Sequence, residues 1–169
     1  MNNYPKHYVP KYISIKDRGV QLKNLHKSRK MYKKGKYFQR PKIKTFRSKP
    51  SQHVKNAKEL YKIDNVAPSR ELVKATKCSM KTLDKIANKG RGAYYSSGSR
   101  PNQSAESWAI ARLASAVTGG NASIVDYHLL NDGCKKESKA LKLAKQTCKK
   151  QNKCTNKNKT RKITLQKKI

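Results

Sequence analysis

Acidic residues are scarce in this sequence. Nine Asp and Glu stand against 42 Lys and Arg, which gives a formal net charge of +33 over 169 residues. A compact protein with such a charge repels itself unless a partner neutralises it. The imbalance therefore predicts a polyanionic or acidic partner: nucleic acid, an anionic membrane surface or an acidic protein face.

Long apolar runs are also missing. Apolar residues make up only 35% of the chain, which has two Phe and one Trp. No segment approaches the roughly 20 apolar residues that a membrane-spanning helix needs. The N-terminus lacks the charged and apolar regions of a signal peptide. We therefore expect synthesis in the cytosol and no core that spans the whole chain.

The sequence contains no cysteine pattern typical of a zinc site. None of the four cysteines forms a Cys-x-x-Cys pair, and no His lies near Cys148 and Cys154. Ligand spacing of that kind is what structural zinc requires. We expect reduced thiols, no metal and no other cofactor.

Residue sets that support catalysis are missing as well. The glycine-rich stretch at 89–104 leads into a predicted helix but lacks the Gly-x-x-x-x-Gly-Lys-Ser/Thr motif of a phosphate-binding loop. Glu106, Asp126 and Asp132 have no neighbouring His pair, and His128 is interpreted as a core residue. We expect a protein that is not an enzyme and has no small-molecule substrate.

The positive charge is unevenly distributed along the chain. Residues 1–50 hold 16 Lys and Arg with one acid, residues 51–132 hold 12 with seven acids, and residues 133–169 hold 14 with one acid. The corresponding net charges are +15, +5 and +13. This division predicts a mainly α fold: a small helical module at 51–132 with one short strand, flanked by long extended basic arms at 1–50 and 133–169.

The first arm combines cations with aromatic residues and prolines. Pro5, Pro10, Pro41 and Pro50 favour extended chain over long helices. Aromatic side chains in such an arm are suited to docking into pockets of a partner, whereas a disordered tail is the alternative. The predicted partner-docking residues are Tyr8, Tyr12, Tyr32 and Tyr37. The residues predicted to contact a polyanion or an acidic surface are Arg29, Lys30, Lys33, Lys34, Lys36 and Arg40.

Four stretches have the spacing of apolar residues that predicts helices. They are residues 51–63, 70–90, 105–118 and 136–150. The second fits one long helix or two short ones, with Gly90 in the position of a C-cap. Residues 122–130, which are β-branched and compact, indicate a strand or a short extended segment. The chain beyond residue 151 has no period and is predicted to be a solvated or polyanion-bound tail.

The 105–118 helix has the clearest boundaries. Ser104 is placed to cap its N-terminus, and Gly119 and Gly120 to end it. Trp108 is predicted to be substantially buried. Leu113 and Val117 are expected beside it in the core.

The loop before this helix contains Gly98, Arg100 and Asn102. We expect Asn102 to stabilise the turn by bonding backbone, and Arg100 to reach a carboxylate or backbone carbonyls. The alternative is an exposed surface loop in which neither side chain has a partner.

Residues 89–130 resemble a known type of module. They include Gly-Ala-Tyr-Tyr-Ser-Ser-Gly-Ser-Arg-Pro-Asn-Gln-Ser at 92–104, Ala-Arg-Leu-Ala-Ser-Ala at 111–116 and Thr-Gly-Gly at 118–120. This stretch resembles a small uncharacterised module of large double-stranded DNA viruses, notably those that infect algae. It covers 42 of the 169 residues. The resemblance implies a viral setting and carries over no catalytic residue.

In that setting we expect a minor structural protein of the virion. It would cement the inner face of a large icosahedral capsid through its basic arms. Its partners would be the jelly-roll major capsid protein and other minor capsid proteins, with DNA or the inner membrane surface as further contacts. The alternative is a basic core protein that neutralises packaged DNA, and a ribosomal-type RNA-binding protein is a third interpretation.

Overall fold

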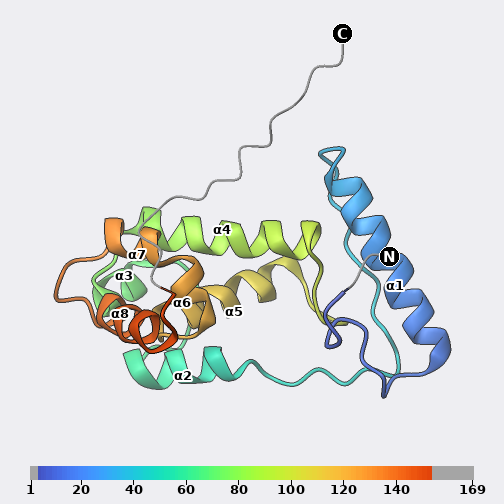
Figure 1. The fold of residues 1–169 in the computed structure, drawn as a ribbon, viewed down its shortest axis with the longest axis horizontal. Helices are drawn as coiled ribbons and strands as arrows, with labels where there is room; N and C mark the ends of the chain where they lie inside the picture. The colour runs from blue at the N-terminus through green and yellow to red at the C-terminus, as the bar shows by residue number, and fades with distance from the viewer. Residues whose placement is uncertain (1–3, 154–169) are drawn as a thin grey trace, which may run out of the picture.

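The computed structural model describes residues 4–153, and within them the fold is mainly helical, as predicted (Figure 1). The helices in this range are α1 (Ile15–Tyr32), α2 (Gln52–Tyr61), α3 (Arg70–Thr76), α4 (Met80–Ser96), α5 (Ala105–Val117), α6 (Asn121–Val125), α7 (Tyr127–Gly133) and α8 (Lys139–Gln151). Residues 154–169, most of the predicted C-terminal tail, lie outside the described residues. None of the helices in the described range has the length and hydrophobicity needed to cross a membrane.

Helix α1 corrects the expectation of an extended arm. Residues 15–32 form an 18-residue helix because no proline interrupts them. The Ser14 side chain accepts a hydrogen bond from the backbone N–H of Asp17, and the Asp17 carboxylate complements the helix dipole in the first turn. Residues 33–51 contain turns and irregular chain without helix or strand.

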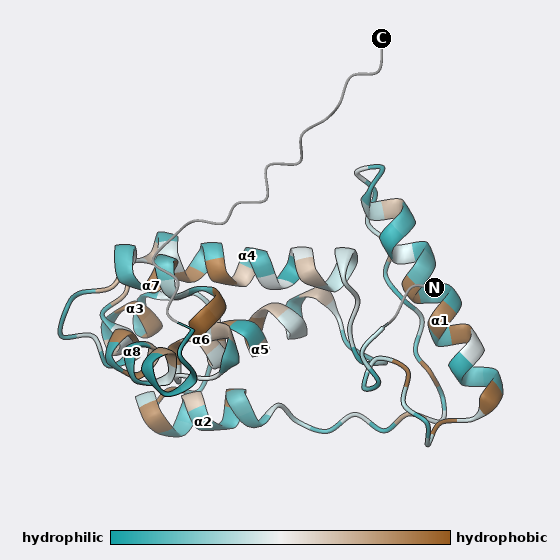
Figure 2. Cartoon of the chain, viewed as in Figure 1, coloured by the Kyte–Doolittle hydropathy of each residue, from teal (hydrophilic) through white to brown (hydrophobic). Residues whose placement is uncertain are grey.

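Helices α2 to α8 share one hydrophobic core. Helices α4 and α5 lie side by side along the long axis of the molecule, and the shorter helices gather around one end of this pair (Figure 1). Hydrophobic residues on α4 and α5 alternate with hydrophilic ones along each helix (Figure 2), and several of the hydrophobic residues are fully buried. Fully buried side chains of this core include Leu72, Leu83, Ile86, Leu113, Val117 and Leu130. Helix α8 completes this core with four residues: Ala140, Leu141, Ala144 and Cys148.

The predicted helices are confirmed with different ends. Helices α2, α5 and α8 match the predicted stretches, and residues 70–96 form two helices separated at Lys77, whose φ is 56°. Gly90 does not cap a helix but lies inside α4. A Cβ at Gly90 would lie 2.6 Å from the Cα of Ala109, so this glycine allows α4 and α5 to approach closely.

The predicted strand at 122–130 is wrong, because these residues form α6 and α7. Ser123, Tyr127 and Leu130 are buried, which is the i, i+4, i+7 spacing of a helix, whereas Val125 is 60% exposed. Asp126, between the two helices, is fully buried. It pairs with Arg112 at 2.8 and 2.9 Å and with Lys89.

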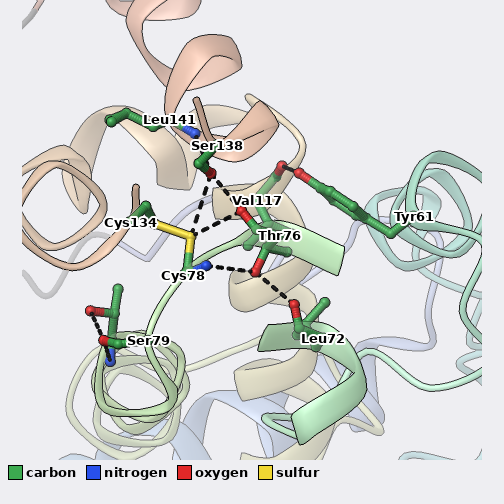
Figure 3. Close-up of a disulfide and its surroundings, with 10 residues drawn as sticks. Tyr61, Leu72, Thr76, Cys78, Ser79, Val117, Cys134, Ser138 and Leu141 are labelled. Atoms are coloured by element: carbon green, nitrogen blue, oxygen red, sulfur yellow. Dashed lines mark hydrogen bonds between the residues drawn. A yellow bond between two sulfur atoms is a disulfide. The ribbon is translucent and has the colours of Figure 1, made fainter. Parts of the chain in front are cut away.

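A disulfide joins Cys78 to Cys134, where the sequence analysis expected reduced thiols (Figure 3). It ties the α3–α4 connection to the residue after α7. Backbone hydrogen bonds from Ser79 to Gly133 and from Lys135 to Lys77 run alongside it. The disulfide therefore closes the end of the core opposite α1.

We predict that the disulfide stabilises the fold by about 4 kcal/mol, because it closes a loop between cysteines 56 residues apart. Urea unfolding of the wild type with and without reductant should show this loss. The double variant Cys78→Ser/Cys134→Ser serves as the control, since reductant should not change its unfolding. Unfolding curves that coincide for oxidised protein and for protein shown by thiol titration to be reduced would contradict the prediction.

Candidate functional site

We call residues 4–50 the N-terminal unit and residues 51–153 the helical module. The unit lies across the far ends of α4 and α5, away from the other helices of the module (Figure 1). It has a small apolar cluster of its own, made of Ile13, Ile43 and Phe46. Its contacts with the module combine aromatic packing with hydrogen bonds, and two side chains make several of these hydrogen bonds.

The first of these is Arg40, which is only 8% exposed. Its guanidinium donates to the carbonyl of Tyr94 at 2.9 Å, to Ser28 Oγ at 2.9 Å and to Ser99 Oγ at 2.7 Å. The guanidinium also lies 3.7 Å from the centre of the Tyr94 ring. Arg40 therefore joins its own segment to α1, to the end of α4 and to the loop that follows α4.

Burial lowers the pKa of Arg40, and nearby tyrosines partly offset this effect. Within residues 4–153, no carboxylate forms an ion pair with Arg40. A guanidinium nevertheless keeps its charge in proteins. The burial of Arg40 and the use of its terminal nitrogens inside the molecule argue against its predicted contact with a polyanion.

The second is Asn102, which has a φ of 58°. Its Oδ1 accepts from the backbone N–H of Ile43 at 2.6 Å, and its Nδ2 donates to the carbonyls of Ile43 at 3.0 Å and Phe46 at 2.9 Å. The structure thus shows Asn102 bonding backbone, although the backbone is that of residues 43–46 and not that of its own turn. Arg100 is exposed.

The other cations predicted to bind a polyanion divide into two groups. Arg29 is half-buried and donates from Nε to the carbonyl of Ser96 at 3.1 Å, at the end of α4. Its guanidinium also lies 4.6 Å from the centre of the Tyr4 ring. The remaining four are exposed on α1 and the turn after it: Lys30, Lys33, Lys34 and Lys36.

Tyr8 and Trp108 pack together. Tyr8 meets the half-buried Trp108 edge-on, with ring centres 6.0 Å apart. A Cβ at Gly98, whose φ is 100°, would lie 3.3 Å from the Tyr8 ring. Trp108 therefore lies under the N-terminal unit. This corrects its predicted place beside Leu113 and Val117, which are fully buried in the module core.

The other predicted docking tyrosines also contact rings of their own chain. Tyr32 stacks on Tyr95 with centres 6.1 Å apart, and Tyr37 lies 4.9 Å from Tyr95. Tyr12 stacks on Phe46 at 6.1 Å with an interplanar angle of 21°. Of the four predicted docking tyrosines, Tyr12 and Tyr37 remain largely exposed, at 74% and 70%.

Gly119 and Gly120 have the structural positions that the sequence suggested. Gly119, with a φ of 74°, follows α5, and Gly120 precedes α6. A Cβ at Gly120 would lie 2.5 Å from Ser115 Oγ. Both glycines therefore shape the module and lie away from the contacts between the two parts.

A groove of about 360 Å³ opens where three separate segments meet. Residues 6–12 and 46–49 of the N-terminal unit form part of its wall, and residues 100–103 of the module complete it. Of the residues that the structure describes, five cations and no carboxylate line it, together with a histidine and two stacked aromatic rings. The lining residues are Lys6, His7, Pro10, Lys11, Tyr12, Phe46, Arg47, Lys49, Arg100 and Gln103.

The electrostatics of the groove favour anions. Partial burial lowers the pKa of His7, and the nearby Arg100 cation lowers it further. The Lys and Arg side chains of the lining can surround a bound anion with positive charge, while the Tyr12 ring offers a flat apolar face. Within residues 4–153, no three His, Cys, Asp or Glu side chains gather as metal ligands would.

Sequence reasoning identified Tyr12 and Arg100 as separate candidates but missed the groove. The three segments are far apart in sequence, and they meet where the contacts of the N-terminal unit with the module, among them those of Arg40 and Asn102, hold the two parts together. A weak signal was present in the sequence: the run Phe-Arg-Ser-Lys at 46–49 repeats the combination of aromatic and basic residues found at 6–12.

The fold and the groove together define a class of protein: a helical protein whose basic N-terminal unit forms part of a cation-lined groove. Residues 5–133 match a family of unknown function, DUF5824. This match covers well over half of the chain, which therefore belongs to that family. It includes both the N-terminal unit and the module up to the end of α7. No curated protein and no solved structure matches the chain.

We predict that Arg40→Met releases the N-terminal unit from the module. Methionine removes the donors and leaves buried acceptors without partners, a loss of about 1–3 kcal/mol. Hydrogen exchange should become faster in α1 and remain slow in α5. The matched control is Lys42→Met, which removes an exposed cation two residues away. Equal protection of α1 in the two variants would show that Arg40 does not hold the unit in place.

Proposed function

We propose that this chain is a non-enzymatic structural protein that binds nucleic acid through its N-terminal unit. The observation that carries this proposal is the groove, in which five cations and two aromatic rings meet without a carboxylate. Contacts between Lys or Arg and phosphate provide most of the affinity in non-specific nucleic-acid binding.

The charge of the unit supports the same conclusion. Residues 1–50 carry 16 Lys and Arg and one acid, Asp17. The Asp17 carboxylate accepts hydrogen bonds from the Thr45 hydroxyl at 2.6 Å and from the Thr45 backbone at 3.2 Å, and these bonds lower its pKa. The lowered pKa keeps Asp17 ionised at neutral pH, and its single negative charge offsets only one of the 16 cations of residues 1–50.

The helical module has a less positive field than the N-terminal unit, because several of its carboxylates form ion pairs with cations of the module. Asp126 binds Arg112 and Lys89, and Glu106 binds Arg91 at 2.8 and 2.9 Å. Over residues 51–153 the module holds 20 Lys and Arg against eight acids, a net charge of +12 spread over 103 residues, whereas residues 4–50 carry +15 over 47 residues. A polyanion is therefore expected to approach the N-terminal unit first.

The proposed setting is a virion, and the resemblance of residues 89–130 to modules of large double-stranded DNA viruses supports it. Here the chain would neutralise packaged DNA, the alternative that the sequence analysis left open. The use of Tyr8 and Tyr32 in contacts within the chain leaves fewer aromatic anchors for a capsid partner than the sequence suggested.

A capsid-cementing function on the inner face of the shell is the second candidate. The outer surface of α1 favours it, since Ile15 is 80% exposed and Val20 and Leu22 are each 39% exposed. Exposed apolar side chains on one helix are suited to a protein partner such as the major capsid protein or another minor capsid protein. The groove has no part in this function.

We predict that three cations of the groove contribute measurably to the salt dependence of binding. The triple variant Lys11→Gln/Arg47→Gln/Lys49→Gln should flatten the slope of log K against log salt by about 0.7 to 0.9 for each phosphate that the variant no longer neutralises. Titrations of a labelled oligonucleotide over a range of salt concentrations measure the slope. The control Lys58→Gln/Lys74→Gln/Lys81→Gln removes three exposed cations of the module.

The control should keep the wild-type slope. If both triple variants flatten it equally, binding depends on total charge and not on the groove. If the wild type fails to bind nucleic acid at low salt, the proposed function is wrong and the capsid candidate takes its place.

A further inference from the structure

We propose that the groove binds an unpaired nucleotide, with its base stacked on Tyr12 and its phosphates held by the surrounding cations. This inference rests on the proposed function and goes beyond it by naming single-stranded nucleic acid as the ligand. It also gives a role to the most exposed aromatic ring that contacts the groove.

Tyr12 has the geometry of a stacking platform. Its side chain is 74% exposed while it stacks at 6.1 Å on Phe46, which is only 9% exposed. Phe46 is fixed in turn, because its carbonyl accepts a hydrogen bond from Asn102 and its ring packs with Ile13 and Ile43. One side of the Tyr12 ring is therefore supported and much of the rest faces the groove and solvent.

The polar groups around Tyr12 match the other parts of a nucleotide. Lys11, Arg47 and Lys49 belong to the same two segments of the N-terminal unit as the ring pair, and Arg100 belongs to the module. Ammonium and guanidinium groups are the usual ligands of phosphate oxygens. Gln103, the one amide among the described residues of the lining, offers both a donor and an acceptor to the edge of a base.

The shape of the site favours a single strand over a duplex. Bases in a duplex are covered on both faces by their neighbours, so they cannot stack on a side chain without leaving the helix. Unpaired bases stack on aromatic side chains with a gain that depends little on sequence. A groove of about 360 Å³ is also within the size range of small-molecule sites, which suits one nucleotide.

An acidic peptide would satisfy the cations equally well but would not use the exposed ring. This difference makes Tyr12 the residue that decides between the two ligands. Tyr37 provides a matched control, because it is a tyrosine of the same unit with nearly the same exposure, 70%, and it lies outside the groove.

The test measures affinities of the full chain by fluorescence anisotropy. The probes are a ~12-nucleotide oligothymidylate, which falls within known site sizes for single-strand binders, and a duplex of equal length. Tyr12→Ala should weaken single-strand binding by between about fivefold and about 150-fold, the range expected for loss of one stacked base. It should leave duplex binding unchanged. Tyr12→Phe and Tyr37→Ala should both bind as the wild type does.

Other outcomes would overturn the inference in recognisable ways. If Tyr12→Ala loses no affinity, or loses as much for duplex as for single strand, the groove does not stack an unpaired base although the proposed function stands. If an oligoglutamate binds the wild type more tightly than the oligothymidylate does, the ligand is an acidic peptide. If neither nucleic acid binds, the proposed function itself fails.

Discussion

Burying a guanidinium without a carboxylate partner costs free energy, because the charged group loses its hydrogen bonds to water. Hydrogen bonds to protein groups must replace them. Arg40 replaces them with one backbone carbonyl, two hydroxyls and the face of Tyr94. These partners come from α1, from the end of α4 and from the following loop. The same side chain therefore orders all three, and the position of the N-terminal unit depends on it.

The groove is a consequence of that arrangement. With Arg40 in place, the chain that follows it runs past Asn102, whose side chain bonds the backbone of residues 43–46. Phe46 and the basic residues after it are thereby brought to the loop at 100–103 and to the segment around Tyr12. Five cations from three segments of the described chain therefore lie around one groove. A fixed arrangement of cations around an exposed ring can discriminate between ligands by their shape, whereas binding by flexible basic arms depends mainly on the total charge of the ligand.

The sequence predicted the helices that have apolar spacing and clear caps. Helix α5 is the best case, since Ser104 and Ser107 form a capping box at its start and a glycine with positive φ follows its end. Helix α1 was missed because the face it buries includes Gln21 and Ser28, which no hydropathy pattern reveals.

The site was harder to predict than the helices. Arg40 and Lys42 lie two residues apart in the same basic segment, yet Arg40 is buried and Lys42 is exposed. The sequence does not show this difference, because it arises from the fold. Short β-branched stretches such as 122–130 fit a strand or a helix equally well until their neighbours are known.

The central claim is that nucleic acid binds the groove formed by the N-terminal unit and the loop before α5. Chemical acetylation of lysines in the presence and absence of a single-stranded oligonucleotide, read by mass spectrometry, tests it most directly. The account predicts that Lys6, Lys11 and Lys49, which line the groove, are protected by the oligonucleotide. Exposed lysines of the helical module, such as Lys58, Lys74 and Lys81, should react as in the unbound protein. Equal protection of both sets, or protection of the module alone, would contradict it.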